Sequence, residues 1–396
     1  MKRLAQIVTL VVVALLSACG NKEVVRETEP IYTPRYAQGF SIERDKASGE
    51  LLLCVKNPWQ GADNVIYYST LNSDKPAERI VAMSSSYVAM LDAIGCVERI
   101  VGISGCRFIS TPSAQKGIEE GDIAEVGYDS AFDFERIRSL KADMVLLYGV
   151  AGEAKAMTSK FDELAIPYIY IGDYLETSPL GKAEWVVALA YLCGVEEQGK
   201  AFFEGVEERY NALRNKQHCS AYKPRVMLNL PYRDTWFMPP HESYMVRLIE
   251  DAGGEYVLRR EMRGERKMQN AECKIKQNNT LNSQFSILDS QLKKANSSKP
   301  ISLEEALLLA SKADFWLNFG QINSLDELRA TAPRFMGVDA VKFGRLYNNT
   351  KRTNPSRGSD FWESGAVRPD LILADLVQIL HHEATTEELY YYKKLE

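Results

Sequence analysis

The sequence is poor in histidine, with four in 396 residues, so a histidine-rich metal centre or acid/base centre is not expected. It contains no CxxC pair, and its cysteine spacings match no zinc-binding pattern. It has no basic tract of five or more residues and a formal net charge of −5, which gives no indication of nucleic-acid binding. The pattern GxxxxGK[ST] is also absent, which excludes a P-loop for ATP hydrolysis.

The first residues have the pattern of a targeting segment and are left out of the fold prediction. Lys2 and Arg3 precede an apolar run, residues 7–16, that is too short to be a membrane span. The run ends in Leu-Ser-Ala-Cys, which resembles the bacterial lipobox, so we predict a signal peptide over 1–19 and lipidation of Cys19. The alternative is an ordinary secretory signal cut near Ala18.

Residues 20–30 are predicted to form a polar tether, so that one lipid anchor holds the protein at a membrane of the cell envelope. The compartment is then oxidising and permits disulfides. Cys96 and Cys193 lie in apolar helical segments and are expected to be small buried thiols.

The chain length predicts two domains or two lobes, and 45% apolar residues supply material for their cores. Alternating apolar residues predict a β-ribbon over 31–72. Strands then alternate with helices over 73–181, which is typical of an α/β lobe with a parallel sheet. Residues 182–217 are helical with a break near Gly194, and a second α/β lobe follows over 218–385. A polar stretch, 259–299, interrupts that lobe as an irregular insertion.

An internal repeat relates the two lobes. "KADMVLLYG", which ends at Gly149, matches "KADFWLNFG", which ends at Gly320, and each follows a short apolar helix. "LDAIG" at Leu91 similarly matches "IEDAGG" at Ile249. The fold class predicted from this repeat is α/β, with two Rossmann-like lobes, each with a central parallel sheet, bridged by a long α-helix.

Each repeated helix begins with a capping residue and carries a glutamate two positions later. Asp133 and Ser302 are the N-caps, and Glu135 and Glu304 are the glutamates. Glu305 occupies the capping-box position, so Glu304 has no local capping role. Compensation of the helix dipole would explain a single glutamate, at about 0.3–1 kcal/mol. Its occurrence once per lobe favours a shared function.

Four segments together resemble the helical-backbone substrate-binding proteins of ABC importers, in order and spacing over most of residues 78–385. The segments are "RIVAMSSSYVAMLDAIGCVERIVGISG", "DFERIRSLKADMVLLYG", "GKAEWVVALAYLCG" and "VRPDLILADLVQILH". The resemblance implies a ligand cleft between the lobes for an iron–siderophore, haem or cobalamin. It also implies that an ABC permease and its ATPase are partners, and that the chain is neither an enzyme nor the carrier of a resident cofactor.

The resemblance further implies that one surface glutamate on each lobe docks with arginines of the permease. The matching positions are Glu135 and Glu304, and Glu305 remains possible because the second helix is two residues longer. The extension at 31–72 and the insertion at 259–299 depart from the compact family pattern.

Ligands of open α/β sheets bind beyond the carboxyl ends of the strands, and this rule nominates the cleft residues. Aromatic rings with a few arginines suit a large, chelate-like ligand that carries negative charge. The candidates in chain order are Ser85, Tyr87, Arg107, Tyr148, Tyr174, Tyr232, Trp236, His241, Phe319 and Arg352. His241 could bind a metal such as haem iron, but no second histidine or cysteine stands at a useful spacing, so no metal site is predicted.

The leading hypothesis is a lipid-anchored binding protein that passes an iron complex to an importer. A cobalamin carrier is the alternative within the same class. An envelope enzyme such as a metal chelatase would need clustered titratable groups, which the sequence does not show. A structural or adhesion lipoprotein would leave the paired glutamates unexplained.

Overall fold

The computed structural model describes residues 26–71, 76–128, 132–149, 154–215, 222–258, 298–381 and 388–396. The predicted signal peptide with Cys19 lies outside these residues, and so does the predicted insertion 259–299 except for its last two residues. No helix in the described ranges is both long enough and apolar enough to cross a bilayer.

The N-terminal extension is a four-stranded antiparallel sheet rather than a simple ribbon. Its strands pair in chain order: β1 (Thr28–Tyr32), β2 (Phe40–Asp45), β3 (Leu51–Lys56) and β4 (Val65–Leu71). β1 begins inside the predicted tether. Its sequence TEPIY has little apolar pattern and contains a proline, which a strand accepts at the edge of a sheet, where β1 lies. The buried rings of Phe40 and Trp185 pack together, 4.8 Å between their centroids. Trp185 belongs to the helix over residues 179–192, so this contact fixes the sheet against that helix.

The N-terminal lobe is built on a five-stranded parallel sheet of order β7-β6-β5-β8-β9. Its strands are β5 (Ile80–Ala82), β6 (Ile100–Ile103), β7 (Ala124–Glu125), β8 (Met144–Leu147) and β9 (Tyr168–Tyr170). Its helices are α2 (Ser85–Ala93), α3 (Pro112–Glu120), α4 (Phe134–Ser139) and α5 (Ala154–Glu163), with 3-10 turns η1 (Val97–Arg99), η2 (Cys106–Phe108) and η3 (Asp173–Leu175).

The C-terminal lobe also has a five-stranded sheet, of order β12-β10-β14-β15-β16, with only β16 antiparallel. Its strands are β10 (Arg225–Leu228), β12 (Glu255–Tyr256), β14 (Phe315–Leu317), β15 (Leu346–Asn348) and β16 (Lys393–Lys394), beside a hairpin-like pair β11 (Thr235–Met238) and β13 (Lys299–Ser302). Its helices are α8 (Tyr244–Asp251), α11 (Leu303–Ala310), α12 (Leu325–Thr331), α13 (Asp339–Lys342) and α14 (Pro369–His381), with turns η4 (Pro333–Phe335) and η5 (Ser364–Ala366).

The repeated Lys-Ala-Asp sequence has the same structural role in both lobes. The Asp143 carboxylate accepts hydrogen bonds from the backbone amides of Glu78 and Arg79, 3.0 Å each, at the start of β5. The Asp314 carboxylate accepts from the backbone amide of Arg225, 2.7 Å, at the start of β10. Each aspartate therefore ties the strand after the capped helix to the strand that comes first in the sequence of its lobe's sheet, which explains why the sequence repeats there.

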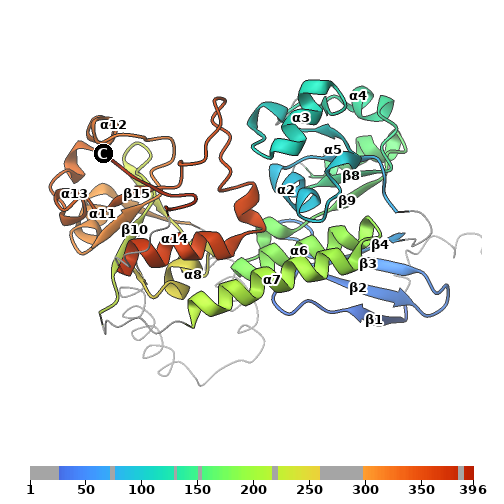
Figure 1. Cartoon of the computed structure of the whole chain (residues 1–396), viewed down its shortest axis with the longest axis horizontal. Coiled ribbons are helices and arrows are strands. Elements are labelled where there is room, and N and C mark those ends of the chain that lie inside the picture. The colour runs from blue at the N-terminus through green and yellow to red at the C-terminus, as the bar shows by residue number, and fades with distance from the viewer. Residues whose placement is uncertain are drawn as a thin grey trace, which may run out of the picture.

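Two helices bridge the lobes, α6 (Pro179–Leu192) and α7 (Glu196–Arg214), and Figure 1 shows them side by side beneath the N-terminal lobe and extending toward α14 and α8 of the C-terminal lobe. α6 begins at 179, ahead of the predicted start, because Ser178 caps it and proline is favoured in the first turn. Every residue of α6 except Lys182 is buried, as expected of a helix that is apolar on all sides. α7 is the amphipathic strut, roughly 28 Å long at 1.5 Å per residue.

The fully buried carboxylate of Glu184, in α6, anchors the N-terminal extension. It accepts the Tyr32 hydroxyl at 2.7 Å and the backbone amides of Arg35, Tyr36 and Ala37 at 2.8 Å. A buried charge is tolerated when its lone pairs are filled in this way. The predicted fold class, two α/β lobes with central parallel sheets joined by a long helix, is confirmed.

Candidate functional site

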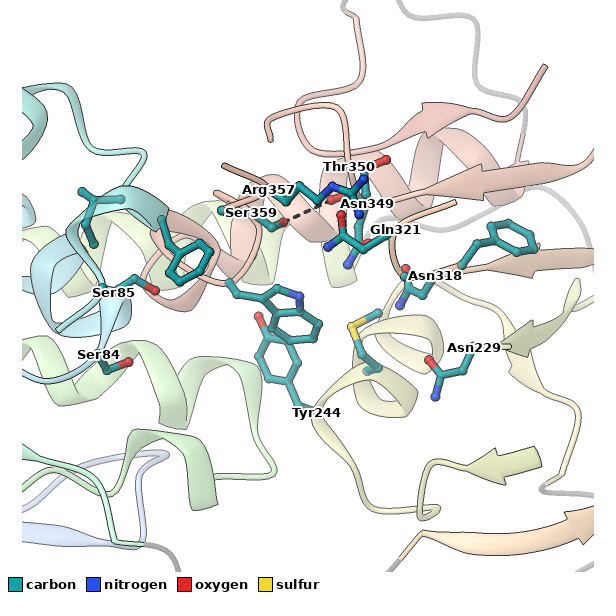
Figure 2. Close-up of a pocket in the computed structure, with 18 of the residues that line it drawn as sticks. Ser84, Ser85, Asn229, Tyr244, Asn318, Gln321, Asn349, Thr350, Arg357 and Ser359 are labelled. Atoms are coloured by element: carbon teal, nitrogen blue, oxygen red, sulfur yellow. Dashed lines mark hydrogen bonds between the residues drawn. The ribbon is translucent and has the colours of Figure 1, made fainter. Parts of the chain in front are cut away.

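A cavity of about 900 Å³ lies where the two lobes face each other. Its walls come from the segments that follow strands β5, β6, β7 and β8 in one lobe and β10, β14 and β15 in the other. In Figure 2, Ser84 and Ser85 approach the cavity from one side and the amide side chains of Asn229, Asn318 and Gln321 from the other. The cavity therefore sits at the carboxyl ends of both sheets, where α/β folds place ligands.

The wall of the N-terminal lobe combines hydroxyl groups and aromatic rings. Ser84 caps α2 by accepting the backbone amide of Ser86 at 3.4 Å, and Ser85 begins that helix. The rings of Phe108 and Tyr128 lie beside each other, 5.0 Å between centroids. Donors at a helix start and a flat aromatic surface can together bind the oxygen atoms and the face of a large ligand.

The loop that carries Phe108 is held by a carboxylate. Glu125 accepts the backbone amides of Gly105 and Cys106 at 2.9 and 2.7 Å. Gly105 has a φ of +77°, and a Cβ atom there would lie 2.8 Å from the Tyr128 ring. The turn therefore requires glycine, and it places the aromatic pair at the cavity.

The wall of the C-terminal lobe is rich in neutral amides. Asn229 and Asn318 directly follow β10 and β14, with φ of +67° and +66°, a conformation that asparagine tolerates. The fully buried Asn348 accepts the backbone amides of Phe319 and Asn349 at 2.9 and 3.1 Å. Its amide nitrogen donates to the carbonyls of Gly320 and Ile322 at 3.0 and 2.6 Å. Asn348 thus fixes the two loops that form this wall.

A hairpin from the C-terminal lobe closes one side of the cavity. Thr353 and Ser359 form an antiparallel bridge, and Figure 1 shows the chain after β15 rising between the lobes. The Asn354 amide donates to the carbonyls of Arg107 and Ile109 in the other lobe, 3.1 and 3.0 Å. Gly358 packs so tightly on Phe108 that an added Cβ atom would lie 1.9 Å from its carbonyl oxygen.

A second contact between the lobes lies next to this hairpin. Glu363, 1% exposed, accepts the backbone amide of Ser110 at 2.8 Å and both the amide and the hydroxyl of Thr111. Burial raises the pKa of the Glu363 carboxyl to about 7. We call Ser110, Thr111, Asn354, Gly358 and Glu363 the interlobe clasp.

The chemistry of the cavity suits binding. The described residues that line it offer hydroxyls, amides, aromatic rings and one guanidinium, that of Arg357, and include no histidine, cysteine or carboxylate. Nor do three or more potential metal-ligating side chains gather anywhere in the described ranges. Trp362, 53% exposed, adds a second large aromatic surface to the wall.

Three of the predicted cleft residues line this cavity: Ser85, Tyr148 and Phe319. The ring of Phe319 is buried against Trp316, 4.9 Å between centroids, so it supports the wall from behind. Their contact with a ligand remains a prediction.

Two of the predicted cleft residues belong to the core instead, and here the prediction needs correction. Tyr87 is fully buried, and its hydroxyl donates to the carbonyls of Leu147 and Ile171 at 3.3 and 3.1 Å. It follows a strand end in the sequence, but the helical turn directs its side chain back onto the sheet. Trp236 is fully buried in β11, and its indole nitrogen donates to the Leu228 carbonyl at 3.0 Å.

The remaining five lie outside the described cavity wall. Arg107 covers the Phe108 ring at 4.5 Å, and Arg352 is paired with Asp360. The Tyr174 hydroxyl donates to the carbonyl of Gly149. The last two, in the C-terminal lobe, are Tyr232, 63% exposed and bridged to Thr235, and His241, whose imidazole lies 4.0 Å from Glu250.

Sequence reasoning missed several residues of the cavity wall, chiefly Tyr128, Asn229, Asn318, Arg357 and Trp362. A signal existed for the two asparagines, because each directly follows an apolar strand. Arg357 lies in "TNPSRGS", whose Asn-Pro and Gly predict a turn but not its direction.

Glu135 and Glu304 occupy equivalent positions at the starts of α4 and α11. Asp133 and Ser302 cap these helices by accepting the amides of Arg136 and Glu305, as predicted. Both glutamates are exposed, and Glu304 lies 3.5 Å from Arg334. In Figure 1, α4 lies at the end of the N-terminal lobe that is farthest from α7. The helix α11 lies on the outer side of the C-terminal lobe.

The two lobes, the bridging helices and the cavity at the strand ends define a two-lobed ligand-binding protein. Residues 80–353, more than half of the chain, match the family described as periplasmic binding protein. The chain belongs to that family.

Known proteins are similar to this chain in sequence or in fold. The chain is 25% identical over 320 residues to an uncharacterized lipoprotein, MJ0878, of Methanocaldococcus jannaschii, covering 78% of this chain and 66% of that protein. A periplasmic heme binding protein from Pseudomonas aeruginosa is similar in structure with a TM-score of 0.55 and 15% identity, over 81% of this chain and 98% of that one. The apo periplasmic heme-binding protein RhuT from Roseiflexus sp. RS-1 has a TM-score of 0.52 and 18% identity, over 78% and 100%. At these identities the two structures show the fold alone.

Proposed function

We propose that this protein is the lipid-anchored substrate-binding component of an ABC importer, and that it captures an iron complex, a siderophore chelate or haem, in the interlobe cavity. The observation that carries the proposal is the cavity of about 900 Å³ at the strand ends of both lobes, because this size suits a ligand of that class. Its wall of hydroxyls, amides and aromatic rings matches the oxygen-rich edge and flat faces of such complexes.

Similar proteins support two parts of the proposal, the iron complex and the anchor. Structures similar to this one include proteins described as heme binding, and one from Staphylococcus epidermidis described as possibly iron-binding. The lipoprotein relative from M. jannaschii supports the anchor, which we assign to Cys19.

We further propose that Glu135 and Glu304 dock the loaded protein on the permease. Both side chains are exposed at the second position of a capped helix, one on each lobe. Exposed carboxylates that face arginines of the permease would orient the binding protein on the permease and accelerate the encounter of the two proteins. In the docked state a permease arginine would compete with Arg334 for Glu304.

Calorimetric titration of the purified protein tests the proposal. The probes are ferric citrate, the ferric trishydroxamate ferrioxamine B, haemin and cyanocobalamin. We expect micromolar or tighter binding of at least one iron complex. Binding of cyanocobalamin alone would identify a cobalamin carrier instead, and binding of none of the four would refute the proposed cargo class.

A further inference from the structure

We propose that Arg357, carried across the interlobe gap on the hairpin 353–359, is the residue that selects a negatively charged cargo. The inference rests on the proposed function and deepens it, because it names the charge of the ligand and the group that recognises it.

The first observation is the distribution of charge in the cavity wall. Among the described residues that line the cavity, Arg357 is the only one with a formal charge. Its side chain is exposed and forms no ion pair within the described part of the chain. Asn349 and Thr350 line the same cavity, and Figure 2 labels all three residues.

The nearest carboxylates in the sequence are engaged elsewhere. Asp360 is buried and paired with Arg352, and Glu363 is buried and accepts from Thr111. Neither of these two carboxylates lines the cavity. The charge of Arg357 is therefore left uncompensated beside neutral amides, where an entering anion would meet it.

The second observation is the backbone of the hairpin. Arg357 has a φ of +67°, a conformation that glycine or asparagine adopts at lower cost. The turn is closed around it, because the Arg357 amide donates to the Asn354 carbonyl at 2.9 Å and the Gly358 amide donates to the Asn354 side chain at 2.8 Å. A large cationic residue held in a strained position indicates a use for its side chain.

The third observation is the attachment of the hairpin to the opposite lobe. Asn354 bonds two carbonyls of the N-terminal lobe, and Gly358 packs directly on Phe108. The tip is thus fixed from both sides, which holds the backbone of Arg357 in place and lowers the entropy lost when the hairpin takes part in binding. A planar guanidinium recognises a carboxylate or similar oxyanion with two parallel hydrogen bonds.

The test uses two pairs of probes that differ in charge. One pair is ferrioxamine B, which carries a pendant ammonium, and its N-succinyl derivative, which carries a carboxylate. The other is haemin, with two propionates, and its dimethyl ester. For the pair that the wild-type protein binds, we expect the anionic member to bind more tightly. Arg357→Gln should weaken the anionic member by about 10- to 100-fold and leave the other nearly unchanged.

Two further variants make the result specific. Arg357→Lys keeps the positive charge but lacks the planar guanidinium that donates two parallel hydrogen bonds, so part of the preference for the anionic probe should remain. Arg107→Gln makes the same charge change on the opposing loop, outside the cavity wall, and should keep the full preference. The inference is overturned if Arg357→Gln keeps the preference, if Arg107→Gln abolishes it instead, or if the wild-type protein has none. Failure of the wild-type protein to bind any probe would refute the proposed function itself.

Discussion

The Thr111 hydroxyl of the N-terminal lobe donates a hydrogen bond to the Glu363 carboxylate of the C-terminal lobe over 2.5 Å. The same carboxylate accepts two backbone amides of the opposite lobe, and only 1% of Glu363 is exposed. The lobes are therefore joined directly beside the cavity, in addition to their connection through α6 and α7.

Closure of the clasp should depend on pH through Glu363. When the lobes separate, this carboxyl returns to water and to an ordinary pKa near 4.3. In the closed clasp burial raises its pKa to about 7, so closure takes up a proton. Closure is thus most favourable below the open-state pKa and weakens as the pH rises through 7. Small-angle scattering of the ligand-free protein should show a larger radius of gyration at pH 8 than at pH 5.

Two variants separate this effect from general pH sensitivity. Glu363→Gln retains an oxygen acceptor but does not titrate, so the radius should no longer change between pH 5 and 8. Asp375 is a buried carboxylate with a raised pKa that accepts only amides of its own lobe, from Tyr390 to Tyr392. Asp375→Asn should leave the change in radius intact. If the radius of gyration of Glu363→Gln still changed between pH 5 and 8, the change would have to come from another titratable group.

Gly358→Ala should force the lobes apart. The added Cβ atom would lie 1.9 Å from the Phe108 carbonyl oxygen, which is backbone and cannot rotate away. We expect a larger radius of gyration, weaker cargo binding and a loss of about 1–3 kcal/mol in unfolding free energy. The matched control is Gly337→Ala, where no heavy atom lies within 4 Å of the added carbon. Equal behaviour of the two variants in scattering would contradict a tight contact at 358.

Asn348→Ala should destabilise the C-terminal lobe and disturb the amide wall of the cavity. The fully buried side chain makes four hydrogen bonds to the loops 318–322 and 348–349, and its removal leaves buried backbone groups unpaired. We expect a loss of about 3 kcal/mol in urea unfolding. Asn64→Ala, at an exposed position, should change stability by less than about 0.5 kcal/mol. A loss below 1 kcal/mol at 348 would show that water replaces the side chain.

Replacing both Glu135 and Glu304 with alanine should reduce cargo uptake by cells while leaving cargo affinity intact. The reason is that both carboxylates lie on the outer surface, on α4 and α11, and neither lines the cavity. Uptake of radioactive iron complex and calorimetric affinity are the two measurements. The control pair, Glu119 and Glu242, is also exposed with one member in each lobe. Lost affinity with normal uptake would remove the docking role.

The architecture was predictable because the sequence repeats itself. Asp143 and Asp314 occur at the same place in two similar segments, and each bonds the start of the neighbouring strand, β5 or β10. Local signals also fixed the caps Asp133 and Ser302. In contrast, the edge strands β1 and β16 carry little apolar pattern, so only pairing within the folded sheets reveals them.

The site was predictable as a location but not as a set of side chains. The strand-end rule pointed to the edge of both sheets where the cavity lies, and it named Ser85 and Tyr148, which line the cavity. It failed for Tyr87, because the direction of a side chain depends on the first turn of the helix. Arg357 reaches the cavity only through contacts of its hairpin with a segment about 250 residues away in the chain, which no local pattern encodes.

Native mass spectrometry of the protein purified from its own host, grown with scarce iron, tests the central claim most directly. We predict a population heavier than the bare chain by the mass of an anionic ferric chelate or of haem, and absorbance that identifies it. Protein that carries a corrin, or that stays at the bare mass after incubation with the iron complexes of its host, would contradict the account.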